Sequence, residues 1–325
     1  MRTLSSLLLL LLLAIGLHAQ SQQRVVVLDM LLENSVLYIL DVADATKRGV
    51  ESGPTTVDTA KIGPFTQSCQ IDDIVEVNGK PAKGLHFTCA YRMNFSATPQ
   101  PGQSIADMAF SNAWPNCNWE LLSKDGKFVG RMVDGGFFPH SVLGGAGAYL
   151  GAQGEHYSSA VPGRAGARTA SIAEDPSMRR IHPGAGSYRV QYHIVPLYFP
   201  EVETTAEGPA VLHTSDLSPV TRAKPARAGE TLTLRARNLG PTTPLMRPGQ
   251  AFPAWTGEPM PDVNADVEID VNGTPAEVIV KSGWPGQVGV YRVDFRMPST
   301  VATGTAQLQL TAAWIPADKV QVAVQ

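Results

Sequence analysis

The feature that most constrains the fold is a glycine-rich segment between Val142 and Glu155. It contains Gly144, Gly145, Gly147, Gly151 and Gly154. Inside a helix, each of these residues would cost about 1 kcal/mol relative to alanine. In a sheet, by contrast, glycines allow bends, bulges and the close approach of neighbouring strands. Because a small barrel closes only when its strands bend, the segment favours a closed β-sheet.

The same segment begins like a dinucleotide-binding fingerprint at Gly145-Ala-Gly147. That fingerprint, G-x-G-x-x-G, opens a helix and would need a third glycine at position 150, where this chain has Leu150. No helical pattern follows Leu150. The sequence therefore favours a structural role for the glycines over phosphate binding.

The composition is typical of a mostly β protein. A length of 325 residues suggests two domains, and 30 glycines with 25 prolines favour short strands and turns over long helices. The formal net charge is −3. This charge gives no reason to expect a nucleic acid or an anionic membrane as a partner.

The N-terminus has the pattern of a secretory signal peptide. Arg2 supplies positive charge, residues 7–17 are apolar, and Ala19 suits the last position before cleavage. We predict a signal peptide at 1–19 and a secreted or periplasmic mature protein, with an uncleaved anchor as the alternative. The apolar run is short for a bilayer span, and no later stretch is long and apolar enough for one, so no membrane span is expected after cleavage.

Export would place the three cysteines in a compartment where a disulfide persists. Cys69, Cys89 and Cys117 allow at most one internal pair, in three ways, and the sequence does not choose among them. Cys89 lies in an apolar strand pattern, which favours a buried thiol. No basic residue stands at a fixed spacing to activate a catalytic thiol.

Alternating and β-branched patterns predict strands in a first domain at 20–200. These strands lie at 25–28, 35–40, 71–77, 85–91, 128–133 and 188–195. Asn78-Gly79 and Asp125-Gly126 are strong turn dipeptides. Residues 42–67 are polar, and 157–186 form the longest irregular segment, so both are predicted to be loops.

Residues 201–212 are predicted to be a linker, and a second domain follows at 213–325. Short strand patterns occur at 231–236, 267–271, 276–280, 288–296, 306–311 and 319–324, with a turn at Asn272-Gly273. Several short strands separated by turn signals predict a β-sandwich.

The glycine-rich segment and the hairpin before it resemble the allene oxide cyclase-like and dirigent-like barrels. Residues 144–154 are similar to the GGTGxFxxARG segment of that family, and residues 118–129 to its strand, Asp-Gly turn and next strand. Among the positions that differ, Ala146 replaces the family's threonine and Gln153 its arginine. Over residues 24–200 the resemblance implies an antiparallel barrel of six to eight strands.

The second region resembles the immunoglobulin-like C-terminal domain of many secreted bacterial proteins. The matching segments are 228–234, 238–241, 248–251, 271–278 and 289–293. The resemblance implies an immunoglobulin-like β-sandwich that serves as an accessory module and carries no catalytic residues. The predicted fold class is therefore all-β, a barrel followed by a sandwich.

The barrel resemblance implies that a small apolar molecule binds in the barrel mouth or interior. Our first hypothesis is a secreted protein that binds a small hydrophobic ligand, or a cell-envelope or extracellular protein, without catalysis. The second is a cyclase or isomerase acting on a reactive hydrophobic intermediate, whose pocket enforces a folded conformation. The third is a structural envelope or adhesion protein.

The predicted site combines an aromatic lining with an acid or a phenol. For catalysis we select Glu155, Tyr149 and Tyr188, because a carboxylic acid in an apolar pocket has a raised pKa and can transfer protons. The alternative places Glu155 in solvent on the outer strand face. For ligand binding we select Tyr91, Tyr157, Tyr192, Arg179 and Arg180. The two arginines could close over an acidic ligand through bidentate contacts, with a solvated loop as the alternative.

No metal site and no cofactor are predicted from local motifs. The histidines of the mature chain form no H-x-H, HExxH or Cys/His cluster; they are His86, His140, His156, His182, His193 and His213. The chain also lacks the G-x-S-x-G motif of hydrolases. A metal site assembled from distant strands is the alternative that local patterns do not test.

Overall fold

The computed structural model describes residues 24–40, 67–91, 114–135, 139–164, 166–171, 174–175, 177–181, 186–255 and 257–325. Within these ranges the chain is almost entirely β, with one short helix, α3 (Met178–Ile181). The predicted signal peptide and nearly all of the predicted loop at 42–67 lie outside the described residues. The described part of the chain contains no helix with the length and apolar character needed to cross a membrane.

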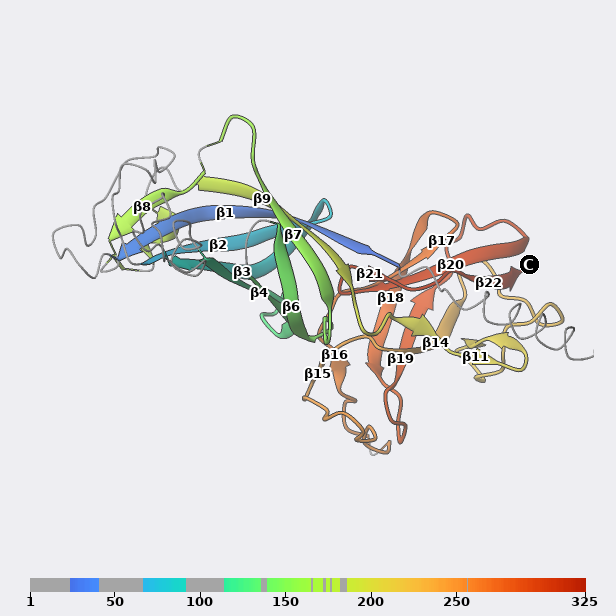
Figure 1. Cartoon of the computed structure of the whole chain (residues 1–325). Coiled ribbons are helices and arrows are strands. Elements are labelled where there is room, and N and C mark those ends of the chain that lie inside the picture. The colour runs from blue at the N-terminus through green and yellow to red at the C-terminus, as the bar shows by residue number, and fades with distance from the viewer. Residues whose placement is uncertain are drawn as a thin grey trace, which may run out of the picture.

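The N-terminal half forms a closed antiparallel barrel of eight strands (Figure 1). The strands are β1 (Val26–Leu40), β2 (Gln67–Val77), β3 (Lys80–Tyr91), β4 (Trp114–Leu122), β5 (Phe128–Gly135), β6 (His140–Gly147), β7 (Gln153–Ala160) and β9 (Gly186–Val195). Consecutive strands pair from β1 to β7, and β9 pairs with both β7 and β1, which closes the ring. The predicted antiparallel barrel is confirmed.

The glycine-rich segment forms the hairpin between β6 and β7. Gly147 has a φ of +67°, and a Cβ atom there would lie 2.6 Å from the Val129 carbonyl oxygen. On the neighbouring strand β5, a Cβ atom on Gly130 would lie 2.5 Å from the ring of Tyr149. The missing side chains therefore allow the turn to close and the Tyr149 ring to pack directly on the barrel wall.

The barrel interior next to the C-terminal part is apolar. Alternate residues of each strand point inward, and the Trp119 ring packs edge-on against those of Tyr149 and Tyr192, with centroid distances of 4.8 and 5.7 Å. Burying one large apolar side chain contributes about 1.5–3 kcal/mol, so this half of the interior holds the barrel together. Other buried members are Leu28, Met30, Ile74, Leu121, Met132 and Ile194.

A bulge at Asn34 exchanges the two faces of β1. Asn34 has a φ of 56°, and the register of β1 shifts here against both β2 and β9. Leu32 is buried in the barrel core before the bulge, and Ser35 reaches the interior after it. Tyr38 then packs with Ala170 in a separate apolar cluster. The bulge thus brings a hydroxyl group into the interior and turns apolar residues outward.

The segment 157–186 is more ordered than its sequence predicted. Strand β7 continues to Ala160, β8 (Arg168–Ser171) pairs parallel with the end of β1, and α3 follows. Strand β9 pairs with β1 as far as Ser35. Beyond that point, from Val36 to Ile39, β1 pairs with β8 instead. A buried ion pair fixes the segment, because Arg168 Nη1 donates to Glu174 Oε2 at 2.8 Å.

The C-terminal part is a curled, open sheet that folds into two sandwich-like layers. Its longer strands are β14 (Thr231–Arg237), β17 (Val267–Val271), β18 (Thr274–Gly283), β19 (Val290–Arg296), β20 (Gly304–Ala312) and β22 (Val320–Val324). Strand β18 belongs to both layers, since its first residues pair with β17 and its later residues with β19. The short strands are β10 (Glu201–Val202), β11 (Thr204–Thr205), β12 (Gly208–Pro209), β13 (Val211–His213), β15 (Thr242–Thr243), β16 (Asp262–Val263) and β21 (Ile315–Pro316).

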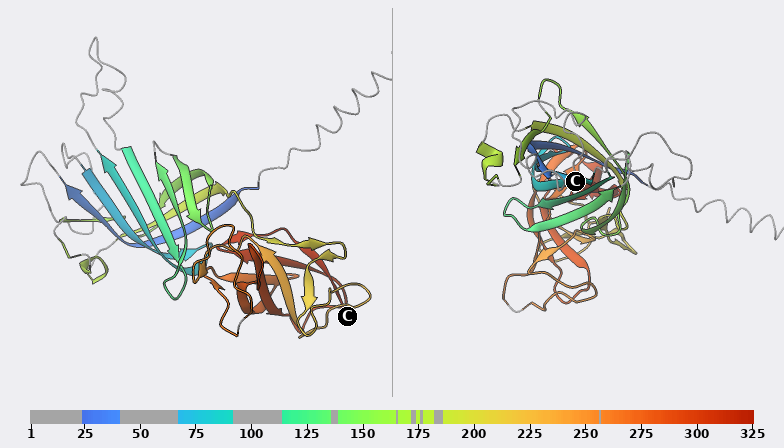
Figure 2. Two further views of the ribbon diagram at one scale, coloured as in Figure 1. Left: turned by 90° about the horizontal axis from the view of Figure 1, so that it is seen from below. Right: turned by 60° about the vertical axis from the view of Figure 1, so that its left-hand side comes forward.

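The two parts pack end to end (Figure 2). Their buried apolar residues form one continuous cluster. The Tyr149 hydroxyl donates to the Ala313 carbonyl at 2.9 Å, and Asn264 Nδ2 donates to the Phe128 carbonyl at 2.8 Å. Within the segment predicted to be a linker, β10 already pairs with β14 of the C-terminal sheet. Two ion pairs add to the contact, Arg24–Asp318 and Lys80–Glu268.

Candidate functional site

Beyond the apolar half, the barrel interior contains a ring of polar side chains that we call the polar layer. Each of the eight barrel strands contributes one of its members, in strand order Ser35, Asp72, His86, Cys117, Asp134, His140, His156 and Tyr192. Seven of them are buried, and the His140 side chain is only 12% exposed. Such a concentration of buried polar groups is unusual in a small barrel, whose interior is normally filled by apolar side chains.

The register of the sheet explains why these residues lie at one level. Asp72 is directly opposite His86 on β2 and β3, and Cys117 is opposite Asp134 on β4 and β5. His156 on β7 is opposite both His140 and Tyr192. Because directly opposed residues share a face and lie close together, strand pairing places these members side by side in the barrel interior.

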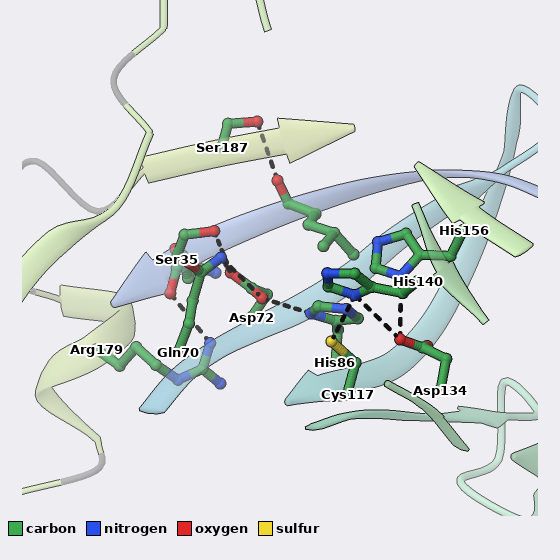
Figure 3. Close-up of polar contacts among 12 residues, drawn as sticks. Ser35, Gln70, Asp72, His86, Cys117, Asp134, His140, His156, Arg179 and Ser187 are labelled. Carbon is green, nitrogen blue, oxygen red and sulfur yellow. Dashed lines mark hydrogen bonds and ion pairs between the residues drawn. The ribbon is translucent and has the colours of Figure 1, made fainter. Parts of the chain in front are cut away.

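One group within the layer is centred on Asp72. Gln70 Nε2 donates to its carboxylate at 2.9 Å, the Ser35 hydroxyl donates to it as well, and His86 Nδ1 lies 2.8 Å from Asp72 Oδ2 (Figure 3). A carboxylate in this contact accepts a hydrogen bond, which assigns the proton of His86 to Nδ1. Nε2 of His86 is then a free acceptor.

Two nitrogens of this region have no hydrogen-bond partner among the described residues. They are Nε2 of His86 and Nε1 of Trp119. His86 is 3% exposed and Trp119 1% exposed, and the two residues are directly opposite one another on β3 and β4. Leaving a buried polar group unsatisfied costs about 1–3 kcal/mol, so two neighbouring cases in one layer require an explanation.

A second group is centred on Asp134. The Tyr192 hydroxyl donates to Asp134 Oδ2 at 2.8 Å, while Nδ1 of His156 and Nδ1 of His140 lie 3.1 and 3.4 Å from Oδ1. Cys117 Sγ is 3.3 Å from the same Nδ1 of His140. Figure 3 shows His86 between this group and the Asp72 group, and its ring centroid lies 6.3 Å from that of His156.

Burial and hydrogen bonding shift the pKa values of the second group in opposite directions. Burial alone would raise the pKa of Asp134, but hydrogen bonds from His140, His156 and Tyr192 outweigh it and hold that pKa well below its usual range. Burial, and then the Asp134 charge, raises the pKa of the Cys117 thiol and that of the Tyr192 phenol. Burial also lowers the pKa of His156. At neutral pH the group therefore contains a carboxylate, a thiol, a phenol and a neutral imidazole.

The arrangement argues against Cys117 as a catalytic nucleophile. A thiol is activated when its pKa falls, whereas here the pKa of Cys117 is raised. A relay from acid to base to nucleophile also needs both ring nitrogens of the histidine, but the same Nδ1 of His140 faces both Cys117 and Asp134. The group is instead a set of donor atoms suited to a metal ion. One ligand atom each from Cys117, Asp134, His140 and His156 lies within 4.8 Å of the others.

The residues selected for catalysis do not meet in this layer. Glu155 lies next to the inward-facing His156, and strand alternation places it on the outer face of β7, half-exposed rather than in an apolar pocket. Tyr149 is buried, but its hydroxyl already donates to Ala313. Tyr188 is half-buried, and the backbone N–H of Ala167 donates to its hydroxyl.

Of the two ligand-binding tyrosines whose side chains the structure describes, Tyr157 and Tyr192, only Tyr192 lies in the polar layer. Tyr157 lies on the outer face of β7, with its ring centroid 5.5 Å from that of His193. Tyr91 ends β3, and its side chain lies outside the described part of the structure. The aromatic lining therefore consists of Trp119, Tyr149 and Tyr192.

The two arginines expected to close over an acidic ligand bind an acid of their own chain. Nη2 of Arg179 donates to Asp73 Oδ1 at 2.6 Å, and Nε of Arg180 donates to Oδ2 at 2.9 Å. Asn34 Nδ2 also donates to Oδ2, at 2.8 Å. Asp73 neighbours the inward-facing Asp72, so these contacts fasten α3 to the outside of the barrel.

Sequence reasoning missed most of the polar layer because its members are far apart in the chain. One signal was present in the strand patterns. His86, Cys117 and Asp134 each alternate with outward-facing neighbours. On the same strand faces lie buried apolar residues such as Trp119 and Met132. Polar residues at core-facing positions of a strand are exceptions that indicate function. Recognising them required knowledge of which face is inside.

A cavity of about 420 Å³ lies outside the barrel interior, where the β6–β7 turn meets the C-terminal part. Leu150, Tyr198, Leu245 and Tyr291 are among its lining residues. Junctions between domains often hold small molecules, so this cavity is an alternative location for an apolar ligand.

The fold and the layer together define a β protein with a closed barrel, a polar ring inside it and a curled, open sheet packed against the barrel. No protein-family model matches the sequence, and a search of curated proteins finds no significant match.

Proposed function

We propose that the protein is exported and acts as a binding protein, with the polar layer of the barrel as its binding site. Export is supported by the pattern of residues 1–19 and by the disulfide between Cys69 and Cys89. Disulfides persist in oxidising compartments outside the cytoplasm. This pair answers the question that the sequence left open, and it leaves Cys117 as a buried free thiol.

The observation that carries the proposal is the pair of unpartnered nitrogens on His86 and Trp119. The Trp119 N–H needs an acceptor, and Nε2 of His86, in the tautomer fixed by Asp72, needs a donor. A hydroxyl group on a ligand supplies both. The adjoining rings of Tyr149 and Tyr192 offer apolar contact, so the proposed ligand is a small apolar molecule with a hydroxyl-type head group.

The layer favours binding over the cyclase or isomerase alternative. A general acid or base works best when its pKa lies near the working pH. Here the pKa of Asp134 is well below neutrality, and those of Cys117 and Tyr192 are well above it. These three groups can position a ligand but are poorly suited to moving protons at neutral pH.

Native mass spectrometry of the protein purified from its own host tests the proposal. We expect a co-purifying small molecule in the wild-type protein. Its occupancy should fall at least about tenfold in Trp119→Phe, which removes the N–H donor, because an unpaired buried group costs about 1–3 kcal/mol. His86→Phe should show the same loss. Trp284→Phe, in the C-terminal part, is the matched control and should keep full occupancy.

Two results would overturn this proposal. The first is the absence of any bound small molecule from wild-type protein that is folded by circular dichroism. The second is a molecule retained equally by Trp119→Phe and His86→Phe, which would place the site elsewhere, with the cavity between the two parts as the next candidate.

A further inference from the structure

We infer that Cys117, Asp134, His140 and His156 form a binding site for one divalent transition-metal ion of the zinc type. The inference goes beyond the organic ligand proposed above and uses other members of the polar layer. It stands on three observations: the distances between the donor atoms, the way the contacts share atoms, and the surroundings of the buried charge.

Three of the six distances between the donor atoms are close to the edge length of a metal-centred tetrahedron. Zinc lies about 2.0–2.3 Å from nitrogen, oxygen and sulfur ligands, which places tetrahedral ligands about 3.3–3.6 Å from one another. The measured separations are 3.4 Å from His140 Nδ1 to Asp134 Oδ1, 3.1 Å from His156 Nδ1 to the same oxygen, and 3.3 Å from His140 Nδ1 to Cys117 Sγ. The first is long for a hydrogen bond to a carboxylate, which is usually about 2.7–2.9 Å.

The contacts also share atoms in the way that ligands of one ion do. Nδ1 of His140 faces both Cys117 and Asp134, and Oδ1 of Asp134 faces both histidines, as the dashed lines in Figure 3 show. A hydrogen-bond chain would engage different atoms of each side chain. Here one atom of each residue faces the others, and all four lie within 4.8 Å.

The surroundings of Asp134 indicate that a positive charge belongs at the centre of the group. Asp134 is fully buried, and no lysine or arginine is among its partners within the described residues. A cation held between buried ligands would balance the carboxylate. On binding, the Cys117 thiol gives its proton to water as the sulfur–metal bond forms. Each histidine binds through Nδ1, so the proton that Nδ1 donates to Asp134 in the metal-free protein moves through water to Nε2.

The neighbouring residues fix the ligands in the way that metal sites require. The Tyr192 hydroxyl holds Oδ2 of Asp134 and so leaves Oδ1 directed at the histidines. The Tyr192 ring also stacks on His156, with centroids 4.7 Å apart and an interplanar angle of 27°. The Thr88 side chain is hydrogen-bonded to Cys117. Contacts of this kind orient ligands, and their loss typically lowers metal affinity about 10–100-fold.

The donor set further specifies the class of ion and the role of the site. A thiolate with two imidazoles favours zinc or similar transition metals over magnesium or calcium, which prefer oxygen ligands. Four protein ligands complete a tetrahedral shell without an open position, which is typical of sites that hold a metal rather than catalyse with it. The inferred centre therefore stores or carries the ion, or stabilises the barrel.

Metal titration of the full mature chain tests the inference. After chelator treatment, we expect the protein to bind a single equivalent of Zn²⁺ in competition with a chromophoric chelator. Co²⁺ should give intense tetrahedral absorption bands and a thiolate-to-cobalt charge-transfer band. Cys117→Ser should lose the charge-transfer band, and Asp134→Asn should lower the affinity at least about tenfold. His193→Gln, on the outer face of the barrel, is the matched control and should change neither readout.

Tyr192→Phe adds a variant that keeps every ligand. It should bind zinc about 10–100-fold more weakly while retaining the charge-transfer band. Near-ultraviolet circular dichroism of each metal-free variant verifies its fold. If a variant is unfolded, the test rests on the cobalt spectrum of the wild type alone. A wild type that binds no stoichiometric zinc, or binds Co²⁺ without the thiolate band, overturns the inference. Trp119→Phe should still bind zinc, which separates this result from the test of the organic ligand.

Discussion

The barrel and the C-terminal sheet are both built from antiparallel strands, but they differ in how they treat a buried carboxylate. In the C-terminal sheet, Asp294 accepts hydrogen bonds from Arg292 Nη2 at 2.7 Å and from the Thr233 hydroxyl at 2.7 Å. In the barrel, Asp72 and Asp134 are just as buried, yet neither has an arginine or lysine partner within the described residues.

This difference underlies our proposal that the barrel is the region that binds a ligand. A buried charge costs several kcal/mol unless a partner offsets the cost, and the C-terminal sheet provides that partner within its own chain. The barrel surrounds its carboxylates with hydroxyl, amide and imidazole groups and leaves one nitrogen each of His86 and Trp119 unsatisfied. Natural proteins depart from full polar satisfaction mainly at functional sites, which is why we place function in the barrel.

The largest expected effect is the loss of the aromatic centre of the barrel. Trp119→Ala should lower the free energy of unfolding by about 3–5 kcal/mol, because it removes a fully buried ring packed against Tyr149 and Tyr192. Phe295→Ala, at a buried position of the C-terminal sheet, should cost a similar amount. Urea unfolding with the disulfide intact measures both. A loss below about 1 kcal/mol for Trp119→Ala alone would show that the barrel interior is not packed as a core.

The second prediction contrasts the two kinds of carboxylate directly. At a free zinc concentration of roughly 100 times Kd, a single site should stabilise the wild type by about 2.7 kcal/mol. Asp134→Asn, with an affinity at least about tenfold lower, should gain about 1.4 kcal/mol or less at the same zinc concentration. Asp294→Asn should retain the full gain of the wild type, although the variant itself should be destabilised by about 1–3 kcal/mol through the unpaired Arg292. Thermal unfolding with and without zinc measures the stabilisation of each variant. Equal stabilisation of Asp134→Asn and Asp294→Asn by zinc would contradict a metal site at Asp134.

The third prediction concerns the contact between the two regions. Tyr149→Phe removes only the hydroxyl that donates to Ala313, and the buried carbonyl left behind should cost about 1–2 kcal/mol. Tyr291→Phe removes a similar bond to Gly240, at 3.0 Å, from a half-buried position within the C-terminal part. Water can replace the Tyr291 bond more easily than the buried Tyr149 bond. We therefore expect the free energy of unfolding in urea to fall by about 0.5–1 kcal/mol for Tyr291→Phe. A larger loss for Tyr291→Phe than for Tyr149→Phe would contradict a firmly docked interface.

The smallest expected effect is a pH dependence on the outside of the barrel. Burial would raise the pKa of Asp73, but hydrogen bonds from Arg179, Arg180 and Asn34 outweigh it and lower the pKa. A lowered folded-state pKa adds stability above the unfolded value of about 3.9, and this stability is lost as the pH falls through the folded value. Below about pH 4, the wild type should therefore lose stability more steeply than Asp73→Asn.

The C-terminal sheet offers a matched case for this last prediction. Burial would raise the pKa of Glu203, but Arg235 and Arg237 outweigh it and lower the pKa. Glu203→Gln should therefore flatten the acid limb in the same direction. Urea unfolding from pH 5 downward measures both variants, and an acid limb as steep in the variants as in the wild type would mean that the ion pairs do not persist in solution.

More of the fold than of the candidate site could be predicted from the sequence. Glycine density at 142–155 indicated bent strands in a closed sheet, and alternation indicated the strands around His86 and Tyr192. The segment 157–186 was predicted to be irregular, and β8 was missed because a four-residue strand carries little periodic signal. The site was predicted on the wrong strand face at Glu155, because alternation shows that neighbours face opposite ways but not which face is inside.

The sequence by itself determined that this chain is made of short antiparallel strands, with a closing bend where side chains are missing. Only the tertiary structure decided that Cys69 pairs with Cys89, that Arg179 and Arg180 bind Asp73, and that every barrel strand contributes one member to the polar layer. The physical reason is that strand propensity is local, whereas closure and the bulge at Asn34 set the register of strands distant in sequence. That register decides which polar groups share the interior of the barrel.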